Sequence, residues 1–306
     1  MYRPLVGIGA IIVMAVACVA VEPSPRGDVP LATILYLNYG YDYWTGECKG
    51  GVESTGWERP SERGLTPEAG YYCSGDDKYI DQALREMKKA GISVVILSWN
   101  GWGDVAFNGK IEAPDYVAID RTIDKVFGHL DGMKAAILVE PYYNLRLDLD
   151  NVLPEHKQKI LDRVWAHYER HPSKVFFWDN KPLLVTFWPS GNHQWSLGDV
   201  DDDRFTHRQW GVLDRGADWD MTAIDSSLEM VRFDPGLDEG VYDQAWKKVF
   251  DNQESVKMIG VYGWNPWAEM ASIEPTVEYG DTLVEKTRWY FNRFDHGEKY
   301  RLYSGD

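Results

Sequence analysis

The stretch DKYIDQALREMKKAGISVVILSW, residues 77–99, decides the fold class. Its first half carries apolar residues at helical spacing on one face: Ile80, Ala83, Leu84 and Met87. We therefore predict a helix over residues 77–90, ended by Gly91. Residues 93–98 then form a continuous apolar run, which is typical of a strand buried on both faces of a parallel sheet. A helix that leads directly into such a strand indicates a β/α repeat.

The same alternation continues on both sides of this stretch. Further strands are expected at residues 33–37, 135–139, 183–187 and 258–262. Further helices are expected over residues 115–130, from Pro154 onward, and through residues 283–294. Residues 192–251 are the least regular, with short strands predicted near 209–213 and 221–224. Alternating strands and helices imply parallel pairing with crossover helices, and 306 residues suit a single-domain α/β protein of the (β/α)8 barrel type.

The first 30 residues differ from the rest of the chain. After Arg3, an uncharged run ends in small residues, so residues 1–21 are predicted to be a secretory signal peptide or an uncleaved signal anchor. Cys18 follows Ala-Val-Ala, which weakly resembles a lipoprotein cleavage site. Residues 22–30 form a Pro-rich tether, and residues 31–306 are assigned to the barrel. We therefore expect a secreted or extracytoplasmic, membrane-anchored protein.

Two cysteines remain beyond Cys18, namely Cys48 and Cys73. In an oxidising compartment they would pair, closing a loop of about 25 residues and stabilising the fold by roughly 3 kcal/mol. The alternative is two unpaired thiols in a cytosolic protein, and the signal-like start favours the disulfide.

The composition excludes several classes of partner. A net charge of −16 argues against nucleic acid and against adhesion to anionic lipid. The seven His residues show no ligand spacing, and Arg204 stands where a calcium loop over residues 199–203 would need Gly, so neither a metal nor another cofactor is predicted. The 14 Trp and 18 Tyr exceed what a core needs, and amphipathic rings suit the faces of sugars. Packing of many of these rings in the core is the alternative.

Aromatic, amide and carboxylate side chains follow five of the predicted strands. In a barrel the catalytic groups lie where the strands end, so these residues are expected to share one face. Flat rings stack on sugars and amides bind hydroxyl groups, which predicts a glycan cleft. The candidate binding residues are Tyr36, Tyr39, Trp99, Trp102, Tyr142, Trp188, Trp264, Asn265, Trp267 and Glu274.

Two carboxylates are the candidate catalytic groups. Glu140 directly follows a buried strand, where a charge must leave the core or have a partner. The alternative to a catalytic role is an ion pair with Arg146 or with a neighbouring strand. Glu269 lies in a Trp-rich segment, and an apolar environment would raise its pKa into the range of a general acid. The alternative for Glu269 is a helix-capping carboxylate.

Residues 264–275, WNPWAEMASIEP, resemble the Asn-Glu-Trp-His-Glu-Gly…Ile-Glu-Pro signature of glycoside hydrolase family 99, the endo-α-mannosidases, and of related family 71/99-like barrel proteins. Weaker matches occur in the same order, and the resemblance covers residues 31–294. They lie at residues 70–74, 90–99, 139–142, 234–236 and 279–280.

The resemblance implies a (β/α)8 barrel that cleaves α-mannoside-type linkages with retention. It makes Glu269 the acid/base, and it places Glu140 and Trp99 against the reacting sugar. Pro266 replaces the family's other catalytic carboxylate. Since glycoside hydrolysis generally needs two carboxylates, either Glu140 serves as the base or the chain is a non-catalytic glycan-binding or cell-envelope protein.

Overall fold

The computed structural model describes residues 29–42, 45–49, 65–99, 114–139, 154–187, 202–210, 221–223, 240–254, 256–267 and 272–305. The strands are β1 (Leu31–Tyr36), β2 (Val94–Trp99), β3 (Lys134–Val139), β4 (Phe177–Trp178), β5 (Lys181–Phe187), β6 (Thr206–Trp210), β7 (Met221–Ala223) and β8 (Met258–Val261). The helices are α1 (Asp77–Lys89), α2 (Pro114–His129), α3 (Pro154–Arg170), α4 (Gly240–Asp251) and α5 (Thr282–Asp295).

The described strands form one sheet that is parallel except at β4. Its parallel order is β6-β5-β3-β2-β1-β8-β7, and β4 adds to β5 in the antiparallel direction. The first strand therefore lies between the second strand and the last one. Within the described residues β6 and β7 are the two ends of the parallel order, so the α/β class is confirmed while closure into an eight-stranded barrel stays a prediction.

The strand register brings the strand ends to one edge of the sheet. Tyr36 at the end of β1 pairs with Ser98, and Trp99 at the end of β2 pairs with Val139. Every residue of β1 and β2 is buried, as the continuous apolar runs predicted. Side chains that follow these strands are consequently held by a rigid core.

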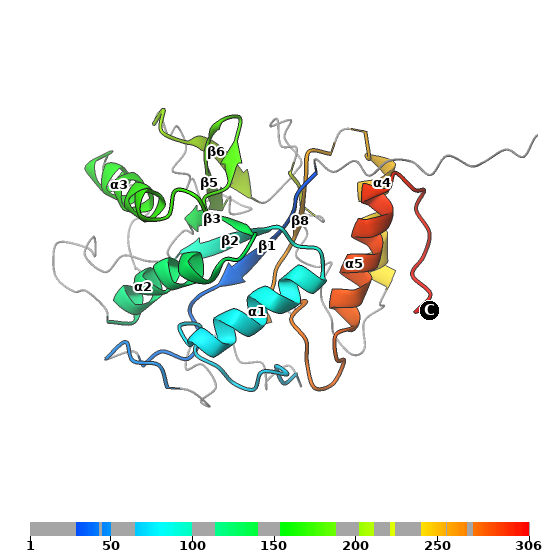
Figure 1. Cartoon of the computed structure of the whole chain (residues 1–306), viewed down its shortest axis with the longest axis horizontal. Coiled ribbons are helices and arrows are strands. Elements are labelled where there is room, and N and C mark those ends of the chain that lie inside the picture. The colour runs from blue at the N-terminus through cyan, green and yellow to red at the C-terminus, as the bar shows by residue number, and fades with distance from the viewer. Residues whose placement is uncertain are drawn as a thin grey trace, which may run out of the picture.

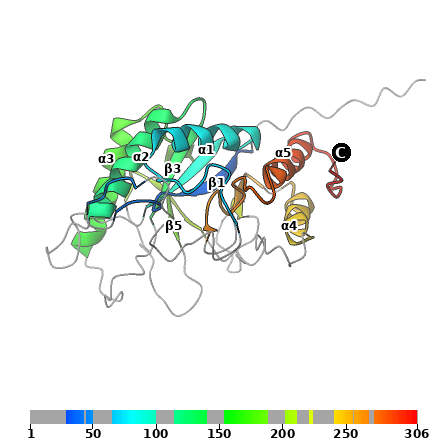
Figure 2. The same cartoon turned by 90° about the horizontal axis from the view of Figure 1, so that it is seen from below.

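The helices cover the sheet and agree with the sequence pattern. Figures 1 and 2 show α1, α2 and α3 along one side of the sheet, with α4 and α5 next to each other near the C-terminus. Helix α1 begins with the Asp76 side chain accepting a hydrogen bond from the Lys78 amide. It ends at Lys89, and Gly91 follows the C-cap residue Ala90 with a φ of +87°, which suits glycine. The short strand predicted near 209–213 begins three residues earlier, and β4 and α4 were not predicted.

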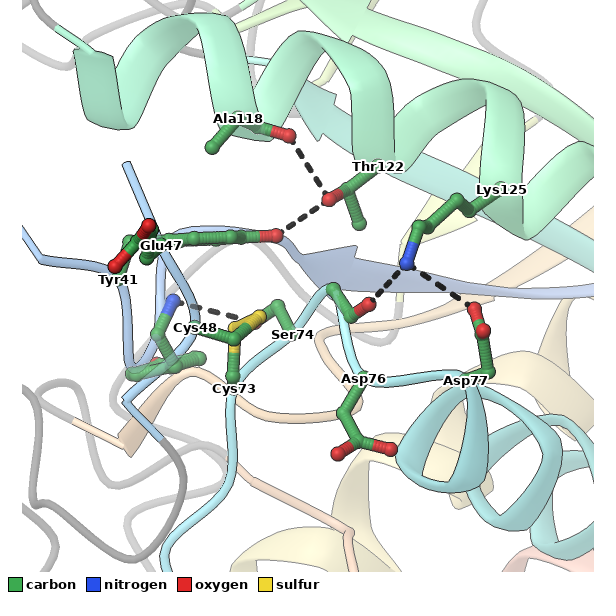
Figure 3. Close-up of a disulfide and its surroundings, with 12 residues drawn as sticks. Tyr41, Glu47, Cys48, Cys73, Ser74, Asp76, Asp77, Ala118, Thr122 and Lys125 are labelled. Carbon is green, nitrogen blue, oxygen red and sulfur yellow. Dashed lines mark hydrogen bonds and ion pairs between the residues drawn. A yellow bond between two sulfur atoms is a disulfide. The ribbon is translucent and has the colours of Figure 1, made fainter. Parts of the chain in front are cut away.

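The predicted disulfide between Cys48 and Cys73 is confirmed, with 5.5 Å between the two Cα atoms. Figure 3 shows that it joins the segment after β1 to the loop that leads into α1. Two contacts hold the same region against α2. The Tyr41 hydroxyl bonds to Thr122, and Lys125 Nζ donates to the Gly75 carbonyl at 2.8 Å.

Residues 1–28 lie outside the described residues. None of the described helices is long and apolar enough to cross a membrane. No group of three or more His, Cys, Asp or Glu side chains within the described ranges is arranged to hold a metal ion.

Candidate functional site

The predicted site residues divide into two sets. Five of them, Trp102, Glu140, Tyr142, Trp188 and Glu269, lie outside the described residues. The others lie in the described part of the chain and are at most 6% exposed: Tyr36, Tyr39, Trp99, Trp264, Asn265, Trp267 and Glu274. Hydrogen bonds connect five of these directly or through one hydroxyl, as predicted for residues at neighbouring strand ends.

The Asn265 side chain links the turn after β8 to the end of β1 through hydrogen bonds. Its Oδ1 accepts from the Tyr36 amide at 2.8 Å, and its Nδ2 donates to the Tyr36 carbonyl at 3.1 Å. The same Nδ2 lies 3.1 Å from the Tyr72 hydroxyl and 3.2 Å from the Tyr79 hydroxyl. The polar atoms of this fully buried amide are therefore engaged within the protein, and a contact of Asn265 with glycan stays a prediction.

Two tyrosines join this amide to the rest of the site. The rings of Tyr72 and Tyr79 stack with centroids 3.5 Å apart. Trp267 Nε1 donates to the Tyr72 hydroxyl at 3.2 Å, and the Tyr39 hydroxyl donates to the Asn265 carbonyl at 2.5 Å. These contacts link the segment after β1, the segment before α1 and the segment after β8.

Glu274 is the buried carboxyl group of this cluster. It is 6% exposed, and its Oε2 accepts from the Tyr72 hydroxyl at 2.7 Å. Burial raises the pKa of Glu274 to about 8, although the hydrogen bonds from Tyr72 and Tyr79 partly offset that rise. The group is therefore mostly uncharged at neutral pH.

Pro266 occupies a packed position beside the end of β8. It is buried, and a Cβ atom added at Gly263 would lie 3.4 Å from its Cδ atom. The peptide bond between Tyr262 and Gly263 is cis. Position 266 thus lies in the packed turn after β8 and carries no ionisable group.

Three further aromatic residues lie at or shortly after strand ends, namely Trp99, Tyr262 and Trp264. Trp264 is fully buried, and its Nε1 has no hydrogen-bond partner among the residues described here. The Tyr36 hydroxyl lies 2.8 Å from the hydroxyl of Tyr262, which directly follows β8. Trp99, 3% exposed, ends β2 at the same edge.

The sequence did not single out Tyr72, Tyr79 or Tyr262. Tyr72 lies in the 70–74 stretch that matches the family pattern, so that match was the available signal. Tyr79 lies on the apolar face of α1, where it reads as an ordinary core residue. Their joint contacts with Asn265 become visible only in three dimensions.

Comparison with known proteins confirms the expected resemblance. No family model matches the chain. The chain is 32% identical over 121 residues to glycoprotein endo-alpha-1,2-mannosidase of Rattus norvegicus, a match that covers 40% of this chain and 24% of that protein. The matched region thus spans about a quarter of the curated relative's length.

Solved structures show that the fold is shared as well. The GH99 endo-alpha-mannosidase from Bacteroides thetaiotaomicron aligns with a TM-score of 0.53 at 16% identity, covering 87% of this chain and 98% of the enzyme. The same enzyme in complex with bis-tris-propane aligns with a TM-score of 0.53 at 15% identity, covering 88% and 98%. At these identities the likeness concerns the fold alone.

Proposed function

We propose that this chain is a glycoside hydrolase-like protein with a (β/α)8 barrel that acts on α-mannoside-type or related glycans. The observation that carries the proposal is the 32% identity over 121 residues to an endo-alpha-1,2-mannosidase. The shared fold and the cluster of aromatic and amide side chains at the strand ends support it.

In this proposal Glu269 is the acid/base and the glycan lies over the strand ends. The usual second carboxylate is missing, because Pro266 stands at its position. Glu140, which follows β3, is then the candidate for the second carboxylate that glycoside hydrolysis needs.

We also propose that the protein works outside the cytoplasm, either secreted or tethered to a membrane. The disulfide between Cys48 and Cys73 supports this location, since such bonds persist in oxidising compartments. The glycan is the proposed partner, and the acidic net charge of −16 gives no reason to expect nucleic acid.

The test compares the wild-type chain with Glu269→Gln on an α-mannan. We expect the wild type to release reducing ends, and the variant to lose release while it still binds the polymer. Glu278→Gln is the matched control, because Glu278 follows Glu269 in the sequence and its Oε2 accepts from the Thr66 amide at 2.8 Å. Equal release by the wild type and Glu269→Gln would rule out the assigned role.

A non-catalytic glycan-binding or cell-envelope role is the second candidate. It is favoured by Pro266, which provides no carboxylate, and by the internal hydrogen bonds of Asn265 and Glu274. Binding of α-mannan by the wild type without any release of reducing ends, across a broad glycan panel, would select this role over hydrolysis.

A further inference from the structure

The segments that precede and follow Glu269 in the sequence are linked through the carbonyl oxygen of Trp264. Trp264 O accepts from the Ile273 amide at 3.1 Å, from the Glu274 amide at 2.9 Å and from Ser272 Oγ at 2.8 Å. Residues 264–267 and 272–274 therefore lie side by side, and Glu269 falls between them in the sequence.

The Tyr72 hydroxyl joins side chains of the same two segments, and the Tyr79 hydroxyl contacts Asn265 and Glu274 as well. The Tyr72 hydroxyl lies 3.1 Å from Asn265 Nδ2, 3.2 Å from Trp267 Nε1 and 2.7 Å from Glu274 Oε2. The amide and indole nitrogens are donors only, so the one proton of the hydroxyl is directed to Glu274. Glu274 is thus the acceptor that orients Tyr72 to receive both nitrogens.

The environment of Glu274 favours a supporting role over proton transfer. Within the described residues no cation forms an ion pair with it, and burial keeps its pKa high enough for a neutral carboxyl group at pH 7. Tyr72 itself is fixed by its neighbour Cys73, which the disulfide ties to Cys48.

We propose that Glu274 is a positioning residue that, through the Tyr72 hydroxyl, holds Asn265 and Trp267 and so fixes the chain on both sides of Glu269. This inference rests on the proposed function, in which Glu269 is the acid/base. Removing the Glu274 acceptor frees the Tyr72 hydroxyl to rotate, and the two segments lose the side-chain link through that hydroxyl.

Hydrogen exchange of the Ile273 and Glu274 amides, read in peptides that cover residues 264–275, tests this brace directly. The brace is the link from Glu274 through the Tyr72 hydroxyl to Asn265 and Trp267. We expect Glu274→Ala to speed exchange there roughly tenfold, with little change in α3, because the opening is local. Glu274→Gln keeps an acceptor of similar size and should retain wild-type exchange. Glu278→Ala is the control, since its bond to Thr66 lies outside the brace.

Activity gives the second readout. On α-mannan, Glu274→Ala should lower kcat roughly tenfold, because the segments that flank the acid/base lose the side-chain link that positions them. Glu274→Gln should restore kcat. Recovery in the glutamine variant separates positioning from a role for the ionised carboxylate.

The outcomes are distinguishable. Unchanged exchange in Glu274→Ala overturns the brace, whatever the activity. If Glu274→Ala does not fold, Tyr72→Phe removes the same hydroxyl and decides by the same exchange measurement. A wild-type chain that neither cleaves nor binds α-mannan defeats the proposed function, and the exchange result then still decides whether Glu274 braces the two segments.

Discussion

Glu274 and Asp120 are both buried carboxyl groups, exposed by 6% and 7%, but their neighbours are of different kinds. Glu274 belongs to a tyrosine cluster without cations, composed of Tyr72, Tyr79, Asn265, Trp267 and Glu274. Asp120 belongs to an ionic cluster between α2 and α3, composed of Asp120, Asp124, Arg163, His167 and Arg170. Glu274 is buried as an uncharged carboxyl group, whereas Asp120 is buried as a charged group that pairs with Arg163 and His167.

The ionic cluster is built around a histidine that is 0% exposed. His167 Nε2 lies 3.0 Å from Asp120 and its Nδ1 lies 2.9 Å from Asp124. Burial opposes a charged ring, but the hydrogen bonds to Asp120 and Asp124 outweigh it and raise the pKa of His167. Burial likewise opposes ionisation of Asp120, and the bonds from His167 and Arg163 outweigh it and lower the pKa of that carboxyl group.

The two clusters consequently depend on pH in different windows. The lowered pKa of Asp120 gives stability that is present above its unfolded value and is lost as the pH falls through the folded value. The raised pKa of His167 gives stability that is complete below 6.5 and is lost as the pH rises through the folded value. The raised pKa of Glu274 gives stability that is complete below 4.5 and is lost as the pH rises toward about 8.

The largest effect is expected from breaking the ionic cluster. Asp120→Ala leaves His167 and Arg163 without a shared partner, and removal of one member of a buried pair costs about 3 kcal/mol or more. Urea unfolding at pH 6 measures the change in the free energy of unfolding.

The control for that variant is Asp162→Ala. Asp162 also pairs with an arginine, Arg204 at 2.8 Å, but its side chain is 56% exposed. Exposed pairs contribute about 0 to 1 kcal/mol, so this variant should lose much less stability. Equal losses in the two variants would show that burial does not set the strength of the ionic cluster.

The second-largest effect is the pH dependence of stability that Glu274 causes, measured by comparison with Glu274→Gln. It distinguishes the tyrosine cluster from the ionic cluster. Between pH 5 and pH 7 the unfolded carboxyl group is ionised while the folded one, with a pKa of about 8, keeps its proton. The stability of the wild type relative to Glu274→Gln should therefore fall by about 2 to 3 kcal/mol over this range. His167 is common to both proteins, so its titration cancels in the difference. A difference that does not vary with pH would contradict a neutral Glu274.

Local patterns in the sequence were enough for most of the fold. The helix predicted over residues 77–90 is α1, Asp77–Lys89, because its apolar face and its glycine stop are encoded within one stretch. Strand β4 has only two residues and exists through its pairing with Lys181 and Pro182. The turn between them places Asp179 and Asn180 at positive φ, which hydrophobic periodicity does not reveal.

The sequence predicted which residues of the site lie close together, but it predicted their contacts less well. Alignment of parallel strand ends correctly brought Tyr36 and Asn265 together, although 229 positions separate them. The amide was expected to contact a sugar, which stays a prediction, and its partner within the protein is the Tyr36 backbone. The hydrogen-bond partner of the Asn265 amide comes from a strand that is distant in the sequence, so the residues near Asn265 do not predict it.

The smallest expected effect concerns the contact between the disulfide-linked segment and α2, the helix that carries Asp120. Thr122 Oγ1 donates to the Ala118 carbonyl at 2.9 Å, so the Tyr41 hydroxyl must be the donor in its bond to Thr122. Tyr41 lies in the segment that the disulfide holds, and Thr122 lies on α2 two residues after Asp120. Tyr41→Phe should therefore cost about 1 kcal/mol in urea unfolding, the usual value of one hydrogen bond.

The double variant Tyr41→Phe/Asp120→Ala shows whether the Tyr41 contact and the ionic cluster act independently. The Tyr41 hydroxyl bonds to Thr122, whereas Asp120 bonds to Arg163 and His167. Because these contacts share no partner, the two losses should add within about 0.5 kcal/mol. A larger deviation would mean that α2 transmits strain between the Tyr41 contact and the ionic cluster.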